Sequence, residues 1–305
     1  MFIRQLKYLV TLSEIRHFAR AAERCHVSQP ALSTAIRNLE KELGLNLVRR
    51  GRRYEGLTAE GEKVVGWAQH LLASYEAMRQ EAMSAHSNLQ GSLNIGAIPT
   101  TMPVVPLLST PCQEQYAGID FTVLSLPAQE ITRRLDSCEL DLGVTYLDGN
   151  MLAGFTVHPL YTERYVLMTR DESVLKGRAR LEWSEVAELP LCLLTGNMQS
   201  RHIIDTAFRQ AGATPRVKME TDSIFGLYSQ IRCSNLCAVV PHSVLSLIEL
   251  RQEICVAQIV PELSRQIGLV ARKQNPYPPM TAAMIELSHG IDLQSRFDRL
   301  IDIVY

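Results

Sequence analysis

The segment that most constrains this chain lies near its N-terminus and reads SQPALSTAIRNLEKELG, starting at Ser28. Ser28 is a favourable N-cap, and Pro30 suits a first helical turn because its missing N–H would have no partner there. Apolar residues recur every three or four positions from Leu32 to Leu43, so one face of this helix is predicted to belong to a core. Gly44 is a favourable residue to end it.

The opposite face of the predicted helix carries short polar side chains, where most surface helices carry long charged ones. A stripe at spacings of four consists of Gln29, Ser33, Arg37 and Lys41. Short side chains let a helix enter the major groove of DNA, where Gln, Ser and Arg can contact base edges. We therefore expect this helix to read DNA sequence.

A second predicted helix, residues 18–25, precedes the first one closely. Its Ala21 and Ala22 allow two helices to approach, and the few residues between Cys25 and Ser28 suit the turn of a helix-turn-helix. The alternative is a well-capped helical hairpin without a nucleic-acid partner, since such starts and alanine pairs are common.

Charge favours the DNA-binding interpretation. Residues 1–53 contain eleven Arg or Lys against four Glu, a formal charge of +7. The other 252 residues carry −8, because the whole chain carries −1. The run RRGRR at residues 49–53 could lie along a phosphate backbone. A basic N-terminal segment on an otherwise acidic chain indicates that this segment alone binds a polyanion.

Composition places the chain among ordinary globular proteins. It has 305 residues, of which 46% are hydrophobic and 21% charged, so two or three domains are expected. No apolar run approaches the roughly 20 residues that a membrane helix needs, and no secretion signal is recognisable, so we expect a cytoplasmic protein without a membrane partner. The seven cysteines are odd in number and scattered, which favours free thiols over disulfides.

A long helix without proline is predicted from residue 58 to about residue 87. Apolar side chains recur along it at spacings of three and four, which is the pattern of a helix that packs against a second copy. The alternative is a helix that lies on the body of its own chain. The predicted dimerisation seam consists of Val64, Ala68, Leu71, Tyr75, Met78 and Ala82.

Beyond Gly91 the pattern changes to short apolar strands that alternate with helices. Strands are predicted at SLNIGAI, IDFTVLSL, LDLGVTYL, RYVLMTR, LPLCLLT, RVKMET, LCAVV and RQIGLVAR. Helices are predicted near 102–116, 128–137, 201–211, 224–232 and 281–288. This alternation is typical of parallel sheets with crossover helices. One large sheet and two smaller lobes are both compatible with the pattern.

The stretch FARAAERCHVSQPALSTAIRNLEKELGLNLVRRGRRYEGLTAEG resembles the winged helix-turn-helix of the LysR-type transcriptional regulators, and the later segments resemble that family in length and order. The chain departs from the family pattern at Val48, commonly Phe, at His26, a turn position often given to Gly, and at Thr34, frequently Arg or Lys. The resemblance implies an α+β multidomain protein in which a long linker helix dimerises and a two-lobed, periplasmic-binding-protein-like α/β domain binds a small-molecule effector.

The resemblance also implies domain limits and partners. The domains would be a DNA-binding domain at 1–58, a linker helix at 59–90 and an effector domain at 91–305, with lobe 1 at about 91–162 and 268–305 and lobe 2 at about 163–267. The partners would be double-stranded promoter DNA, a co-inducer of unknown identity and further copies of the chain, as a dimer of dimers, with RNA polymerase as a further candidate. The predicted DNA contacts are Ser28, Gln29, Pro30, Ser33, Thr34, Arg37, Arg50, Arg52 and Arg53.

Effector contacts are expected where strands run into helix starts, since ligands bind at the carboxyl ends of strands in α/β sheets. The loop after the first strand offers two hydroxyls that could cradle a carboxylate, although a plain N-cap role is the alternative. Two later loops are further candidates, with local capping, surface charge or core packing as the alternatives. The predicted effector residues are Thr100, Thr101, Met102, Asn197, Met198, Gln199, Arg201, Asp222 and Phe225.

Other functional classes lack their motifs. The chain has no GxxxxGK[ST], GxGxxG, HExxH or GxSxG sequence, and its eight histidines lack metal-ligand spacing, so we expect no catalytic residue, no metal and no cofactor besides the effector. One alternative is a redox-sensing regulator of the same family that uses Cys233 and Cys237, against which stands the common role of cysteine as a small core residue. Another is a cytoplasmic solute-binding protein with an accessory helical domain.

Overall fold

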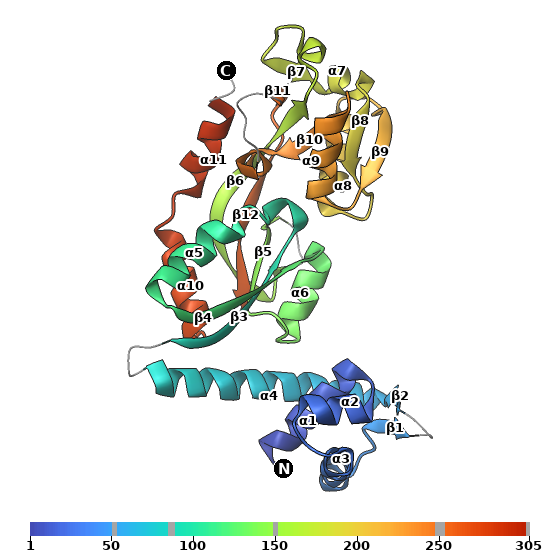
Figure 1. Ribbon diagram of the computed structural model, residues 1–305, viewed down its shortest axis with the longest axis vertical. Helices are drawn as coiled ribbons and strands as arrows, with labels where there is room; N and C mark the ends of the chain where they lie inside the picture. The colour runs from blue at the N-terminus through green and yellow to red at the C-terminus, as the bar shows by residue number, and fades with distance from the viewer. Residues whose placement is uncertain (51–53, 85–88, 149–151, 248–253, 303–305) are drawn as a thin grey trace. The chain divides into compact units, whose positions relative to one another are not determined.

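A computed structural model of the chain describes residues 1–50, 54–84, 89–148, 152–247 and 254–302 (Figure 1). The chain divides into two compact units, residues 1–88 with 136–139, and residues 89–135 with 140–305. Two predicted DNA contacts, Arg52 and Arg53, lie outside the described residues, and Arg50 is described by its backbone alone. Within the described residues, no helix has the length and apolar character that crossing a bilayer requires.

The first unit contains the predicted helices and a small sheet. Its elements are α1 (Ile3–Ile15), α2 (Phe18–Arg24), α3 (Gln29–Leu43), β1 (Val48–Arg50), β2 (Tyr54–Leu57) and α4 (Ala59–Ser84). The two helices predicted at residues 18–25 and after Ser28 are confirmed as α2 and α3. Strands β1 and β2 pair antiparallel, with Val48 opposite Leu57, and form the wing beside the helices.

The core of the first unit explains why its helices pack as they do. Apolar residues at helical spacing in α1 and α3 are fully buried, among them Leu9, Leu12, Leu32 and Ile36. Helix α4 contacts α1, and its Ala68 is buried in this same core.

The predicted dimerisation seam is therefore wrong at Ala68, where the helix lies on its own chain, and Val64 is also partly buried against this core. At 100° per residue the six seam positions fall within about 80° of one another, so they share one face of α4, but only the first turns of that face lie against the core of this unit. The first seam positions face α1, whereas Leu71, Tyr75, Met78 and Ala82 are exposed in the single chain.

The second unit is built on one path of paired strands, in the order β4-β3-β5-β12-β6-β10-β8-β9, with β11 beside β6 and β7 beside β11. The strands are β3 (Gln90–Ala97), β4 (Gly118–Ser125), β5 (Leu142–Tyr146), β6 (Phe155–Thr169), β7 (Arg180–Glu182), β8 (Leu191–Leu194), β9 (Val217–Thr221), β10 (Cys237–Pro241), β11 (Cys255–Val260) and β12 (Ser264–Arg272).

Helices lie on both sides of these strands (Figure 1). They are the 3-10 helices η1 (Pro99–Thr101), η3 (Glu172–Leu175) and η4 (His242–Leu247), and the α-helices α5 (Val105–Gln115), α6 (Ala128–Asp136), α7 (Trp183–Glu188), α8 (Gln199–Gln210), α9 (Ile224–Cys233), α10 (Pro279–His289) and α11 (Leu293–Asp302). The sequence patterns missed β7, β11, the first half of β6, α7 and α11. Strand β7 has three residues and helix α7 has six, which are too few to establish a hydrophobic period.

Two long strands join the lobes of this unit. Strand β3 runs parallel to β4 and β5, and β8 runs parallel to β9 and β10, as the alternating pattern predicted. Strands β6 and β12, in contrast, pair antiparallel from Arg164 opposite Ser264 to Phe155 opposite Arg272. From Tyr165 onward, β6 pairs with β10 instead. The expected two-lobed α/β domain is confirmed, and the lobes share one continuous path of strands.

Candidate functional site

Helix α3 has the capping that its sequence predicted. The Ser28 hydroxyl accepts a hydrogen bond from the Ala31 backbone N–H at 3.3 Å, and Pro30 lies in the first turn. Gly44 ends the helix in the left-handed region, with φ of 67°. Leu32, Ile36 and Leu39 are buried, so the helix is held in the unit by one face alone.

The other face of α3 is free for contact, with one exception. Ser28, Gln29, Pro30, Thr34 and Arg37 are exposed.

Ser33 is only 8% exposed, so the prediction that it projects outward is wrong. At 100° per residue, Ser33 lies about 60° around the helix from buried Ile36, at the edge of the apolar face, where a small side chain is easily covered. Neighbouring Arg37 lies farther from that face.

The wing is tied to α3 by a carboxylate that the sequence analysis did not select. Glu40 is 9% exposed, and its Oε1 accepts the backbone N–H groups of Leu47 at 3.0 Å and Val48 at 3.2 Å. The available signal was position, since Glu40 follows Ile36 by four residues and so lies on the buried stripe. These bonds fix the start of β1, whose Arg49 is exposed.

The turn between α2 and α3 explains one departure from the family pattern. His26 has φ of 54°, in the left-handed region that Gly adopts without strain. Histidine tolerates this region better than most residues. The turn therefore retains the backbone geometry of a helix-turn-helix although the glycine is absent.

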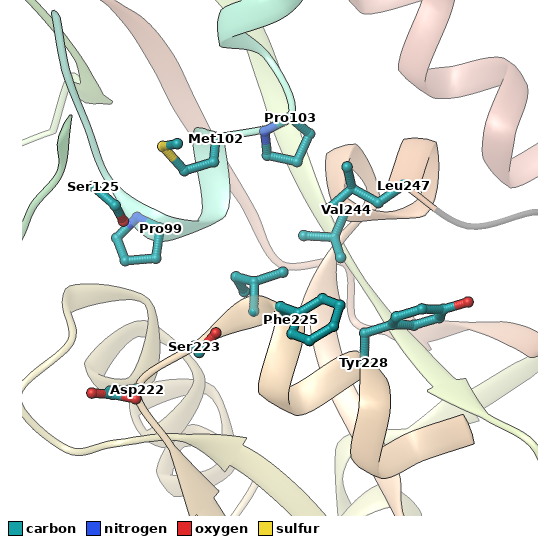
Figure 2. A pocket seen from close by; sticks show the side chains of 11 residues that line it. Pro99, Met102, Pro103, Ser125, Asp222, Ser223, Phe225, Tyr228, Val244 and Leu247 are labelled. Carbon is teal, nitrogen blue, oxygen red and sulfur yellow. The ribbon is translucent and has the colours of Figure 1, made fainter. Parts of the chain in front are cut away.

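The second unit contains a cavity of about 570 Å³ (Figure 2). Figure 2 shows Pro99, Met102 and Pro103 on one side of it, facing Phe225 and its neighbours on α9. The described residues that line it are Pro99, Met102, Pro103, Ser125, Asp222, Ser223, Ile224, Phe225, Tyr228, Val244 and Leu247. Of the predicted effector residues, Met102, Asp222 and Phe225 are in this lining.

The two threonines of the predicted cradle do not line the cavity. Thr100 and Thr101 are 1% and 0% exposed. The Thr101 hydroxyl is within hydrogen-bonding distance of the carbonyls of Ile98 and Val144, both at 3.1 Å, so its role is structural. The Thr100 hydroxyl oxygen is buried without a hydrogen-bond partner among the described residues.

The predicted effector residues of the loop between Asn197 and Arg201 are also absent from the lining. The Arg201 guanidinium pairs with Asp205 at 2.9 Å and with Glu220 at 2.5 Å, and donates to the Leu194 carbonyl at 2.7 Å. A carboxylate effector would have to displace these partners, so the predicted role of Arg201 is wrong.

The other three predicted residues of this loop have local roles. Asn197 Oδ1 accepts from the Thr195 hydroxyl at 2.7 Å, Met198 packs against a hydrophobic cluster, and Gln199 begins α8 half-buried. None of the three lines the cavity.

The cavity surface is mainly apolar. Phe225 is 77% exposed and Leu247 is 56% exposed, and large exposed apolar groups in a concave site are typical of ligand pockets. Asp222 is the charged residue of the lining, and none of the described lining residues is basic. Sequence reasoning missed Tyr228, although it follows Phe225 by three residues and therefore shares its face of α9.

Helix α4 exposes an apolar face along its middle turns, from Trp67 to Met78. Trp67 is 73% exposed, and Leu71, Tyr75 and Met78 are also exposed. At 100° per residue these four side chains fall within an arc of about 80°. Trp67 was not among the predicted seam residues, because the predicted spacing of four residues after Val64 selects Ala68 instead.

The cysteines are free thiols in the structure. Burial raises the pKa of Cys112, Cys192, Cys237 and Cys255, which disfavours the reactive thiolate form at neutral pH. Cys233 is exposed. The described residues contain no group of three or more His, Cys, Asp or Glu side chains placed to hold a metal ion.

Known families match both units. Residues 3–62 match the family described as bacterial regulatory helix-turn-helix protein, lysR family, and residues 86–290 match the LysR substrate binding domain. The chain belongs to the LysR family. It is a DNA-binding transcriptional regulator of LysR type.

Individual relatives of this LysR-family regulator agree with that assignment. It is 30% identical to a hydrogen peroxide-inducible genes activator of Dickeya chrysanthemi, over 90% of this chain and 91% of the relative. It is 29% identical to the DNA-binding transcriptional dual regulator OxyR of Escherichia coli strain K12, over 99% of both chains.

Solved structures share the fold. A variant of full-length OxyR from Pseudomonas aeruginosa has a TM-score of 0.77 at 25% identity, and the match covers 96% of this chain and 98% of that one. Full-length CbnR in complex with its target DNA has a TM-score of 0.67 at 22% identity, with coverage of 95% and 99%.

Proposed function

We propose that this LysR-family regulator reads promoter DNA with the exposed face of α3 and changes its DNA complex when a small molecule binds in the 570 Å³ cavity. The observation that carries the proposal is the exposure of Phe225 in that cavity, because an apolar ligand would remove this ring from water. The protein would act as a binding protein rather than as an enzyme, in the compartment that holds the promoter.

The chemistry of the lining favours an effector with an apolar body. Met102, Phe225 and Val244 offer apolar contact, and the hydroxyls of Ser125 and Ser223 offer hydrogen bonds. The anionic effector expected from the sequence would find Asp222 and no described basic residue there, so we propose a largely apolar effector whose charge is not negative. No other cofactor is needed for this function.

The proposed assembly is a homodimer formed through α4. Its exposed apolar face, Trp67, Leu71, Tyr75 and Met78, would be covered by the same face of a second copy. Leu71→Asp with Met78→Asp should give a monomer in light scattering. Glu76→Lys, on the opposite side of α4, should leave the dimer intact. A dimer that survives the double change would contradict this interface.

The effector proposal is tested by a thermal-shift screen of the full chain against apolar small molecules. A ligand present at 100 times its Kd stabilises the native state by about 2.7 kcal/mol. Phe225→Ala should abolish the shift, whereas Met219→Ala, an exposed apolar residue outside the cavity, should retain it. A hit whose shift is unchanged in Phe225→Ala would place the effector elsewhere.

The names of the relatives favour a second candidate, a regulator that responds to hydrogen peroxide through a thiol. Exposed Cys233 is the thiol best placed for oxidation, since its neighbour Cys237 is buried. Free thiols should then be lost on mild peroxide treatment, in parallel with a change in promoter binding. Cys233→Ser should abolish both changes. An unchanged number of free thiols after peroxide treatment would exclude peroxide sensing through a thiol.

A further inference from the structure

A carboxyl group is completely buried in the strand that joins the two lobes. Glu163 lies on β6 and is 0% exposed. Its Oε2 accepts a hydrogen bond from the Tyr161 hydroxyl at 3.4 Å, and its Oε1 has no hydrogen-bond partner among the described residues. The hydroxyls of Tyr146 and Tyr165 also face it and lie 3.1 Å from each other.

No cation among the described residues neutralises this carboxyl. Arg164, the next residue along β6, pairs with Asp298 on α11 at 2.8 Å. His242 on η4 accepts the Arg164 backbone N–H through Nδ1, and its Nε2 lies 3.4 Å from Asp298. Burial lowers the pKa of His242 to about 4, so this imidazole is neutral at physiological pH.

The remaining neighbours of Glu163 are uncharged as well. Burial raises the pKa of Tyr146, Tyr161 and Tyr165, so the three phenols keep their protons. Burial without a counter-charge also raises the pKa of Glu163 to about 8, because the charged form loses its hydration; hydrogen bonds from the tyrosines oppose this only in part. At neutral pH this group is a carboxylic acid that can donate a hydrogen bond.

The cluster contains tyrosines from both lobes of the second unit. Tyr146 ends β5 in the first lobe, whereas Tyr165 is where β6 begins to pair with β10 of the second. A further hydrogen bond runs from the Ser243 hydroxyl on η4 to the Thr100 carbonyl on η1, at 3.4 Å. Ser243 and Thr100 adjoin the lining residues Val244 and Pro99. A negative charge on Glu163 would therefore weaken the contacts between residues of the two lobes.

We propose that Glu163 is a proton-responsive joint between the lobes: the protonated carboxyl holds the tyrosine hydroxyls of both lobes together, and release of its proton to water loosens the walls of the cavity. This goes beyond the proposed function, because it concerns the chain without effector. It makes the effector domain sensitive to alkaline conditions.

The direction of the stability change follows from the raised pKa. Below the ordinary pKa of 4.5, Glu163 is protonated in both the folded and the unfolded chain. Between 4.5 and about 8 the unfolded chain has lost this proton and the folded chain still holds it, so stability falls as pH rises. Above about 8 both states are ionised and this contribution is constant.

The melting temperature of the full chain, measured from about pH 5 to about pH 9, tests the joint. The difference in melting temperature between Glu163→Gln and wild type should shift steadily in favour of the variant as pH rises, and level off above about pH 8, since the amide cannot ionise. Glu114→Gln, an exposed glutamate of α5, should follow the wild type. A Glu163→Gln curve parallel to that of the wild type would overturn the proposal.

A second measurement applies if Glu163→Gln fails to fold. Infrared difference spectra of the wild-type chain should contain the C=O band of a protonated buried carboxyl at neutral pH and lose it above about pH 9. Amide hydrogen exchange, corrected for intrinsic rates, should increase at residues 99–104 and 242–247 over the same range. No protonated band at neutral pH, or unchanged exchange in these two segments, would refute the proton-responsive joint.

Discussion

The Glu40 carboxylate accepts the backbone N–H of Leu47 at 3.0 Å, and so connects the last turn of α3 to the residue that precedes strand β1 of the wing. Seven residues separate the two, and the chain between them leaves α3 at Gly44. The position of the wing relative to α3 thus depends on this buried side chain together with the packing of Leu47 and Val48 in the core. DNA-binding domains need such rigid support, because contacts to bases and phosphates tolerate little displacement.

Glu40→Ala should destabilise the first unit by about 2 kcal/mol, because it removes two hydrogen bonds to a charged acceptor and leaves two amides unpaired. Hydrogen exchange of the Leu47 and Val48 amides should accelerate, and affinity for promoter DNA should fall. Glu40→Gln retains an acceptor oxygen, so it should reduce the stability of the first unit by less than Glu40→Ala does. Unchanged exchange at these amides in Glu40→Ala would contradict the role given to this carboxylate.

Arg37→Ala should weaken binding to the specific promoter by about 1–3 kcal/mol and relax sequence preference, since Arg37 is exposed on the reading face. Arg49→Ala, in the wing, should weaken binding to all sequences and lower the salt slope by about one. Ser33→Ala serves as a buried control on the same helix and should preserve sequence preference. Fluorescence anisotropy with specific and scrambled duplexes distinguishes these outcomes.

Gly61→Ala should destabilise the first unit by about 3 kcal/mol, because an added Cβ would lie 2.0 Å from the Leu47 carbonyl oxygen. Gly66→Ala is the matched control in the same helix, where a Cβ meets nothing within 4 Å. That change should stabilise the helix by about 0.5–1 kcal/mol. Chemical denaturation followed by circular dichroism measures both, and equal effects would refute the close approach at Gly61.

His26→Gly should raise the stability of the helix-turn-helix slightly, by up to about 1 kcal/mol. Relief of the left-handed backbone strain, about 1 kcal/mol or more, outweighs the added entropy of glycine in the unfolded chain. His26→Val should do the opposite, since a β-branched residue fits this region poorly. Melting temperatures of the two variants on either side of the wild type would support the assignment, and the reverse order would contradict it.

Arg201→Ala should cost stability without changing which small molecules bind. The side chain is 12% exposed and holds two carboxylates, Asp205 and Glu220, so its removal should cost about 1–3 kcal/mol. Ligands found in the thermal-shift screen should give the same shift relative to the variant's own melting point. A selective loss of response to carboxylate ligands would restore Arg201 as an effector residue.

The local features of the DNA-binding unit were predictable from sequence. The N-cap at Ser28, the end at Gly44 and the buried stripe through Leu32 and Ile36 depend on residues within one or two turns of each other. The turn at His26 was placed by the family resemblance, whereas its left-handed backbone, with φ of 54°, was found in the structure. The sequence by itself therefore determined where helix α3 begins and ends and which of its faces is buried.

The tertiary structure decided how distant residues meet. Arg201 is committed to Glu220, nineteen residues away, and Met102 meets Phe225 across one cavity more than a hundred residues later. Glu163 looks like an ordinary surface glutamate in sequence, and it becomes a buried acid because β6 runs between both lobes. Burial and pairing of this kind depend on packing between segments far apart in the chain, for which residue type and spacing carry no local signal.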